Sequence, residues 1–252
     1  MPTMTSAPNP GLLRVMTVNV HKGFSFLNRR FVLRELRDAV REIGADLVFL
    51  QEIHGKRHNA GGLDVPHYEF LADEIWPAFA YGRNAVYTNG DHGNALLSKY
   101  PIVRWQNVDV STARQEKRGL LHCALQLPGR AGIVHAICVH LGLKQSHRAH
   151  QLRQLCDLVQ ERVPAAEPLL VAGDFNDWRG KAHAVLLQCA GLGEVFVEAN
   201  GHAARTFPAR FPLLALDRIY VRSVRDHAPL ALPVHPWSSL SDHAPIAAEI
   251  RL

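Results

Sequence analysis

The stretch LLVAGDFN, residues 169–176, is the most informative segment of this 252-residue sequence. Its apolar part, residues 169–173, has the length and composition of a buried strand, and Asp174 and Asn176 follow where that strand ends. The spacing of apolar residues predicts an amphipathic helix before it, over 146–163, and a second helix after it, over 182–189. A buried strand between two helices is typical of an α/β protein.

The same alternation extends over most of the chain. Strands are predicted over residues 12–20, 46–50, 95–98, 102–110, 119–127, 132–140, 169–173, 216–221 and 244–250, and helices over 30–43, 64–76, 146–163 and 182–189. Gly44 supplies a stop for the first helix, and residues 128–130 suit a hairpin turn. Hairpin-linked strands among alternating strands and helices predict an α/β fold with mixed sheets.

The chain shows no linker rich in Gly, Pro or Ser, so we expect a single domain over residues 11–252. Residues 1–10 are small and polar without an apolar run, which predicts a disordered leader and not a signal peptide. The longest apolar runs are strand-sized and too short for a transmembrane segment. We therefore expect a soluble, cytoplasmic protein, and nothing in the sequence implies an obligate protein partner.

The net charge and the cysteine content give little information about the function. The formal net charge of +5 and the pI of about 9.2 suit a phosphate-bearing partner, but mildly basic proteins are common. The four cysteines, at positions 123, 138, 156 and 189, lie in apolar surroundings with no CxxC pair. This pattern favours four buried thiols over a zinc site or a disulfide.

Acids, amides and histidines fall repeatedly at or near the ends of the predicted strands. These residues are Asn19, Glu52, His140, Asp174, Asn176, Asp217, Asp242 and His243. Taken singly, each suits a helix cap, a turn or an ordinary polar contact. Several at strand ends can converge on one rim of packed sheets, where ligand sites of α/β folds tend to lie.

The residue types in this set also suit one chemistry. Carboxylate and amide oxygens are hard ligands that favour Mg²⁺, Mn²⁺ or Ca²⁺ over zinc. Histidines serve general acid–base or phosphate-stabilising roles near neutral pH. Cleavage of a phosphodiester needs charge neutralisation, an activated water and help for the leaving oxygen, and this set offers all three.

The order of these motifs resembles the endonuclease/exonuclease/phosphatase (DNase I-like) superfamily, from about residue 13 to residue 250. The resemblance rests on the segments 17–20 (TVNV), 51–52 (QE), 93–98 (GNALLS), 140–141 (HL), 173–176 (GDFN), 216–219 (LDRI) and 241–243 (SDH). Any one motif is weak, whereas the ordered set is specific. The resemblance implies a four-layered α/β sandwich, in which two packed mixed sheets are flanked by helices and the site lies at one edge.

The resemblance also implies a metal site, with Mg²⁺ as the cofactor and Mn²⁺ or Ca²⁺ as alternatives. Glu52 is the main metal ligand that it implies, with Asn19 and Asp242 near the metal. Asp174 and Asn176 orient the attacking water and the phosphate, or hold a second metal. One metal or two is left open.

Two histidines complete the implied catalytic set. His243, held by Asp217, is the base or a phosphate contact, and His140 stabilises the phosphoryl oxygens or assists the leaving group. Which histidine is the base stays open. Because adjacent residues of a strand face opposite sides, Asp242 and His243 both serve the site only if they lie in the turn before the last strand.

The substrate is less well defined by the sequence. The segments 19–23 and 205–212 look like those of a compact, sphingomyelinase-like bacterial branch, which favours a small or lipid head-group phosphodiester and leaves peripheral membrane contact open. His21, Lys22, Arg118, Arg205 and Arg210 are candidate substrate contacts, although loop arginines are often simply solvated. A DNA or RNA nuclease is the less favoured alternative. A non-catalytic binding protein is disfavoured because the catalytic set is complete.

Overall fold

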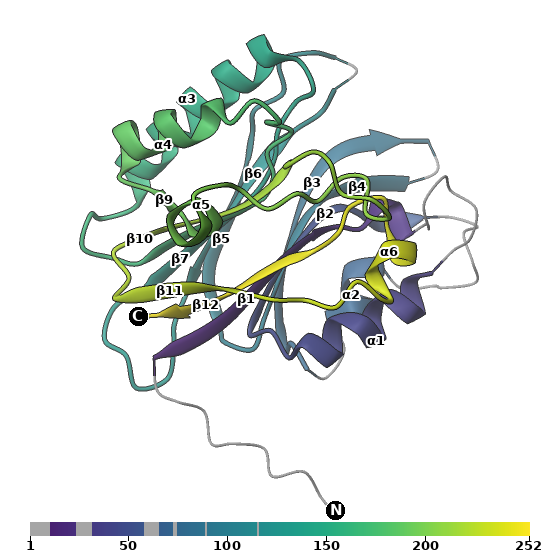
Figure 1. Cartoon of the computed structure of the whole chain (residues 1–252), viewed down its shortest axis with the longest axis horizontal. Coiled ribbons are helices and arrows are strands. Elements are labelled where there is room, and N and C mark those ends of the chain that lie inside the picture. The colour runs from purple at the N-terminus through teal and green to yellow at the C-terminus, as the bar shows by residue number, and fades with distance from the viewer. Residues whose placement is uncertain (1–10, 24–31, 58–65, 73–74, 89, 115) are drawn as a thin grey trace, which may run out of the picture.

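The computed structural model describes residues 11–23, 32–57, 66–72, 75–88, 90–114 and 116–252, and it contains two six-stranded sheets (Figure 1). The first has the order β11-β12-β1-β2-β4-β3: β11 (Asp226–Leu230), β12 (Ile246–Arg251), β1 (Leu12–Asn19), β2 (Leu47–Arg57), β4 (Gly90–Ser98) and β3 (Ala78–Tyr87). The second has the order β5-β6-β7-β8-β10-β9: β5 (Ile102–Asp109), β6 (Gly119–Leu125), β7 (Val134–His140), β8 (Leu169–Asp174), β10 (Asp217–Arg222) and β9 (Gly193–Glu194). Within them, β1 with β2 and β7 with β8 are parallel pairs and the other pairs are antiparallel, so both sheets are mixed.

Helices cover the outer faces of the two sheets. The helical elements are η1 (His21–Gly23), α1 (Leu33–Ile43), α2 (His67–Ala72), α3 (Gln145–Arg162), α4 (Lys181–Ala190), α5 (Val195–Asn200) and α6 (Trp237–Leu240). In Figure 1, α3 and α4 lie on the second sheet, and α1, α2 and α6 lie on the first. The predicted four-layered α/β sandwich is therefore confirmed.

The strand β7 shows why these sequences form central strands. Ala136 and Cys138 enter the core between the sheets, whereas Ile137 and Val139 pack under α3 and α4. A strand covered on both faces needs a nearly continuous apolar run, which residues 134–139 supply. The polar His140 follows where the strand ends. The apolar runs thus bring the polar strand ends to the edge of the sandwich.

Several element boundaries differ from the prediction. The strand predicted to end at Leu50 continues to Arg57, and only residues 67–72 of the predicted helix 64–76 are helical in the described chain. Residues 30–31, 64–65, 73–74 and the predicted leader 1–10 lie outside the described residues. The strands β3, β9 and β11 and the short helices α5 and α6 were not predicted. The first three are sheet-edge strands, for which a buried apolar run is not required.

The prediction of four unpaired cysteines was wrong for two of them. Cys156 of α3 and Cys189 of α4 form a disulfide, whereas Cys123 and Cys138 are buried free thiols. The two bonded residues are 33 positions apart in the sequence, and only the packing of α3 against α4 brings their Cα atoms to 5.9 Å. Disulfides are favoured in oxidising compartments, so this bond does not support the cytoplasmic location, which stays a prediction.

We expect the disulfide to stabilise the fold by about 3–4 kcal/mol, because it closes a long loop in the unfolded chain. Cys189→Ser should lower the free energy of unfolding by that amount in urea titrations without reductant. Under dithiothreitol the wild type and the variant should coincide. Equal stability of the two proteins without reductant, or four reactive thiols in the unfolded, unreduced wild type, would contradict the assignment.

No helix within the described residues is long and apolar enough to cross a membrane.

Candidate active site

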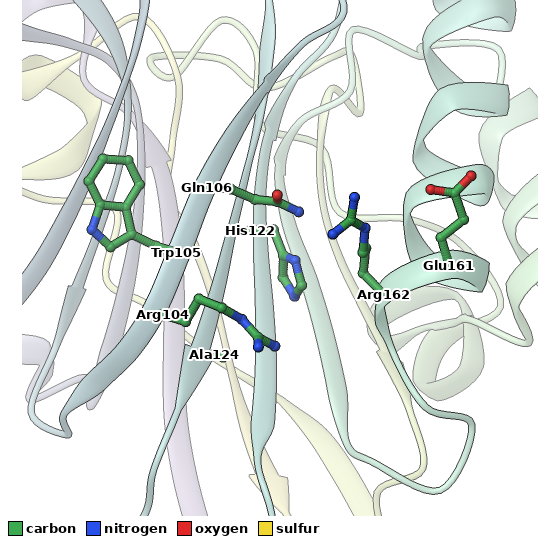
Figure 2. Close-up of a pocket in the computed structure, with 7 residues that line it drawn as sticks. All are labelled: Arg104, Trp105, Gln106, His122, Ala124, Glu161 and Arg162. Atoms are coloured by element: carbon green, nitrogen blue, oxygen red, sulfur yellow. The ribbon is translucent and has the colours of Figure 1, made fainter.

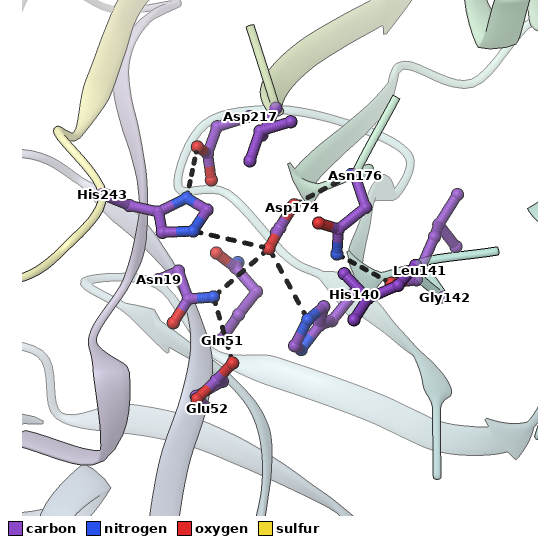
Figure 3. Close-up of polar contacts among 12 residues, drawn as sticks. Asn19, Gln51, Glu52, His140, Leu141, Gly142, Asp174, Asn176, Asp217 and His243 are labelled. Carbon is purple, nitrogen blue, oxygen red and sulfur yellow. Dashed lines mark hydrogen bonds and ion pairs between the residues drawn. The ribbon is translucent and has the colours of Figure 1, made fainter. Parts of the chain in front are cut away.

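Ends of strands from both sheets meet at one edge of the sandwich (Figure 3). In the second sheet, Asp174 pairs with His140 in the parallel ladder of β7 and β8 and with Asp217 in the antiparallel ladder of β8 and β10. In the first sheet, Asn19 pairs with Gln51, the residue before Glu52. Register therefore brings His140, Asp174 and Asp217 together in the second sheet and sets Asn19 beside Gln51 in the first.

Asp174 lies at the centre of this region and is buried. Its Oδ2 accepts a hydrogen bond from Asn19 Nδ2 at 3.2 Å and lies 3.5 Å from His140 Nε2 and 3.9 Å from His243 Nε2. Its Oδ1 accepts from the backbone N–H of Asn176 at 2.9 Å. One carboxylate thus connects residues from both sheets.

His243 is held by Asp217. Its Nδ1 lies 2.8 Å from Asp217 Oδ2, and its ring packs against Phe207 at 5.1 Å between centroids. The carboxylate fixes Nδ1 as the donor and turns Nε2 towards Asp174. Asp242 and His243 lie before the first residue of β12, Ile246, so the condition that they lie in the turn before the last strand is met.

Glu52 reaches the site through an irregular backbone. Its φ of 55° lies in the left-handed region, and the ladder of β2 with β4 shifts register between Leu50 and Ile53. A bulge of this kind re-aims a side chain, and non-glycine residues seldom adopt such a φ outside functional or turn positions. Glu52 Oε1 lies 3.5 Å from Asn19 Nδ2.

Burial and neighbouring charges set the protonation of the central groups. Burial raises the pKa of Asp174 to about 7, and the Asp217 carboxylate adds to the rise while the His243 cation opposes it. Burial disfavours a charged His243, but the carboxylates of Asp217 and Asp174 outweigh it and raise the pKa of His243 to about 10. Burial and the Arg118 cation hold the pKa of His140 well below its usual value. Without a metal, His243 is the charged histidine and His140 the neutral one.

Two groups of side chains offer ligands for a cation. Ligand atoms of Asp174, Asp217 and His243 lie within 4.8 Å of one another in a buried cluster, which could bind a metal. Asp217 Oδ1 is buried without a hydrogen-bond partner in the described chain. Glu52 and Asp242 are only partly buried, at the opening of the site. Together with Asn19 they form the second, outer group. Ser241 connects Asn19 with Asp242 in this group, because its Oγ donates to the carbonyl of Asn19 and lies 3.3 Å from Asp242 Oδ1.

The donor chemistry of both groups fits a hard divalent cation. Carboxylates and the amide oxygen of Asn19 are the ligands that Mg²⁺, Mn²⁺ and Ca²⁺ prefer. The predicted ligands Asn19, Glu52 and Asp242 therefore also suit such a cation. The tightest cluster of ligand atoms is the inner group of Asp174, Asp217 and His243.

The predicted substrate contacts separate into two kinds. His21 and Lys22 follow Asn19 in η1, and His21 Nδ1 lies 3.2 Å from Asp242 Oδ2. Arg118 Nε donates to the carbonyl of Leu141, next to His140, at 3.1 Å. The structure thus places all three beside the site.

Arg205 and Arg210 lie in the loop before β10. Arg205 lines a trough of about 770 Å³ together with Trp178, Arg179 and Leu214. Arg210 is exposed, and within the described chain its side chain makes no hydrogen bond or ion pair. Its neighbour Ala209 donates its backbone N–H to the carbonyl of Asp242, and a contact of Arg210 with the substrate stays a prediction.

Two residues near the candidate active site, His92 and Thr206, were not predicted from the sequence. His92 of β4 is buried, and burial lowers its pKa to about 4, with the nearby Lys22 cation adding to the fall. Thr206 Oγ1 accepts the backbone N–H of Asp217 and so fixes the start of β10. Neither follows a predicted strand, so the strand-end pattern could not reveal them.

Residues 16–243 match the Endonuclease/Exonuclease/phosphatase family. The chain is 55% identical over 244 residues to the Uncharacterized protein YbhP of Escherichia coli (strain K12), covering 95% of this chain and 96% of that protein.

Solved structures show the same fold. An endonuclease/exonuclease/phosphatase from Beutenbergia cavernae has a TM-score of 0.79 at 20% identity, covering 96% of this chain and 72% of that one. TDP2 of D. rerio complexed with single strand DNA product has a TM-score of 0.69 at 19% identity, covering 96% and 99%. At these identities the likeness concerns the fold alone, and it confirms the DNase I-like architecture.

Proposed function

The chain belongs to the endonuclease/exonuclease/phosphatase family, and on that premise we propose that it is a divalent-metal-dependent hydrolase of phosphodiesters. The observation that carries the proposal is the buried group of Asp174, Asp217 and His243 beside Asn19 and Glu52. A buried histidine–carboxylate pair next to oxygen ligands is the arrangement that metal-assisted hydrolysis needs. We further propose that residues 11–252 form one domain.

We propose that Glu52, Asn19 and Asp242 hold Mg²⁺, with Mn²⁺ or Ca²⁺ as substitutes. A bound dication supplies charge neutralisation and Lewis-acid chemistry at the phosphate. The partly exposed position of Glu52 and Asp242 supports this choice, because a substrate phosphate must reach the cation from solvent. The inner group then stays free for proton transfer.

His243 acts as the base in this proposal. Its Nδ1 donates to Asp217, so Nε2 faces Asp174 and can take a proton from the attacking water. A protonated ring accepts no proton, so the base is the neutral form of His243, and a dication held by Glu52, Asn19 and Asp242 would favour that form by charge repulsion. Asp217 then stabilises the imidazolium that forms.

The remaining residues position the reactants. Asp174 and Asn176 orient the water and the phosphate, and Asn176 is itself fixed by donating to the carbonyl of Leu141 at 3.0 Å. His140, a neutral ring, offers an N–H to a phosphoryl oxygen or to the leaving group. Arg118, His21 and Lys22 add positive charge around the substrate phosphate.

For the substrate, we propose a small or lipid head-group diester. The trough beside the site combines Arg179 and Arg205 with Trp178, Leu213 and Leu214, and such a lining suits a ligand with both anionic and apolar parts. Trp178 and Leu213 are also exposed, which supports peripheral contact with a membrane. The DNA product in the TDP2 structure supports the alternative, a nuclease.

The two substrate classes are distinguished by assaying bis(p-nitrophenyl) phosphate and plasmid DNA side by side with Mg²⁺. We expect hydrolysis of the small diester and intact plasmid. Arg205→Gln should weaken use of a glycerophosphodiester, and Arg153→Gln, at an exposed position of α3, is the matched control that should not. Plasmid nicking at the same enzyme concentration would favour the nuclease, and failure of folded protein to hydrolyse either substrate would contradict the proposal.

A further inference from the structure

A second pocket lies on the outer face of the second sheet, beside the end of α3 (Figure 2). Its volume is about 270 Å³, just under the range of roughly 300–1,000 Å³ that drug-sized ligands occupy, so it suits a small ligand. The lining residues are Arg104, Trp105, Gln106, His122, Ala124, Glu161 and Arg162. In Figure 2 the Trp105 ring points away from the other side chains, most of which end in polar or charged groups.

The geometry of the sheet explains this pocket. Gln106 of β5 pairs with His122 of β6, and Arg104 pairs with Ala124, so all four face the same side. This is the side that α3 covers, but the helix ends at Arg162 and leaves the edge strand β5 open. The pocket floor is therefore rigid sheet, and its wall is the last turn of a long helix.

His122 forms the floor of the pocket, and only 4% of its surface is exposed. Its Nε2 lies 2.8 Å from His135 Nδ1, and His135 Nε2 lies 2.6 Å from Glu167 Oε2. The two rings are stacked, with centroids 5.0 Å apart. We call this chain of contacts from His122 through His135 to Glu167 the relay. It occupies Nε2 of His122, so Nδ1 is the ring nitrogen left for a ligand.

Two guanidinium groups reach towards His122 from either side (Figure 2). In the described part of the chain, neither Arg104 nor Arg162 has a hydrogen-bond or ion-pair partner. Burial lowers the pKa of His122 to about 4, and the charges of His135, Arg104 and Arg162 add to that fall. Glu161 is the one carboxylate in the lining. The lining thus holds two guanidinium groups and one carboxylate around a buried ring.

We propose that this pocket binds a phosphate-type oxyanion, either inorganic phosphate or a small phosphomonoester. Two guanidinium groups recognise such an anion by charge-assisted hydrogen bonds, for which arginine is the preferred residue. Gln106 adds a neutral donor at the same wall. A bound dianion also offsets the repulsion between the Arg104 and Arg162 cations on either side of His122.

The relay fixes how His122 responds to the anion. In a neutral His135, Nε2 donates its proton to Glu167, which leaves Nδ1 of His135 as an acceptor. Nε2 of His122 then donates to this Nδ1, and Nδ1 of His122 carries a lone pair. The bound anion favours a proton on that nitrogen, so His122 becomes a third donor. The charged groups that face it are Arg104 and Arg162, with Glu161 beside them and Glu167 behind His135.

This pocket is distinct from the candidate active site. His135 and His140 lie five residues apart on β7, which is about 17 Å along an extended strand. The pocket thus binds its anion independently of the catalytic residues, and the inference does not rest on the proposed hydrolysis.

Imidazole ¹⁵N NMR of the full chain tests the proposal, because it separates this pocket from the active site. Inorganic phosphate and glycerol phosphate are titrated separately at constant ionic strength, and His122→Gln assigns the His122 signals. We expect a saturable shift of the His122 and His135 signals. Arg104→Gln/Arg162→Gln should weaken it at least about tenfold, in line with loss of two charge-assisted hydrogen bonds.

Arg153→Gln, an exposed position on the same helix, is the matched control and should leave the affinity unchanged. Both pocket arginines are exposed, so the double variant should fold normally. Similar affinities for the two probes identify the free anion as the ligand, and at least tenfold tighter binding of the ester identifies a phosphomonoester. Shifts confined to His140 and His243, or an undiminished His122 shift in the double variant, would overturn the proposal.

Discussion

Replacing His243 with alanine is expected to lower kcat for bis(p-nitrophenyl) phosphate at least about 100-fold, the effect of losing a general base. The physical reason is the 2.8 Å contact of Nδ1 with Asp217, which directs Nε2 into the site beside Asp174. No other histidine in the described chain pairs with Asp217. The measurement is steady-state turnover at saturating Mg²⁺, with circular dichroism to confirm folding.

Two further variants separate catalysis from damage to the structure. Asp217→Asn should also reduce kcat, and its combination with His243→Ala should cost little more than His243→Ala alone, because the pair acts as a unit. His150→Ala, at an exposed position of α3, is the matched control and should retain full activity. Near-normal turnover of His243→Ala would remove this residue from the mechanism.

Glu52→Gln is expected to raise the Mg²⁺ concentration for half-maximal activity at least about tenfold and to lower the maximal rate. The substitution keeps the shape of the side chain and removes one negative charge at the opening of the site. The left-handed φ of 55° is retained with either residue, so the fold should not change. Glu42→Gln on the exposed face of α1 is the matched control.

The same titration distinguishes the two candidate cation positions. An unchanged Mg²⁺ requirement in Glu52→Gln, together with loss of Mg²⁺ dependence in Asp174→Asn, would move the cation to the inner group of Asp174, Asp217 and His243. A raised requirement in Glu52→Gln supports the outer position. Activity independent of both carboxylates would exclude both positions.

The strand-end residues could be predicted from the sequence because their placement depends on local pattern. An apolar run long enough to cross the sandwich ends at its edge, so the polar residue that follows must lie there, as Asp174 and His140 do. The turn before the last strand rests on different reasoning: the resemblance assigned both Asp242 and His243 to the site, and adjacent residues of a regular strand would face opposite sides.

Features that depend on packing between distant elements could not be predicted. The Cys156–Cys189 bond follows from the position of α3 against α4. The relay from His122 to Glu167 depends on strand register and on where α3 ends. The exposure of Arg210, in the loop before β10, also could not be read from the sequence.

The register shift at Glu52 is a further case. Gln51 is buried between the sheets, where it donates to Thr17 Oγ1 and contacts Cys138. In a regular strand the next residue would face the opposite side. The sequence shows an acid after a strand, but it carries no signal for the bulge that turns this acid towards Asn19.

The most direct test of the central claim is metal-dependent hydrolysis by the wild-type protein. The protein is treated with EDTA, dialysed and assayed with bis(p-nitrophenyl) phosphate before and after addition of Mg²⁺ or Mn²⁺. We predict no turnover in the stripped protein and recovery that saturates with the added cation. Full turnover without a divalent cation would contradict the account, as would the absence of any turnover by folded protein with either cation.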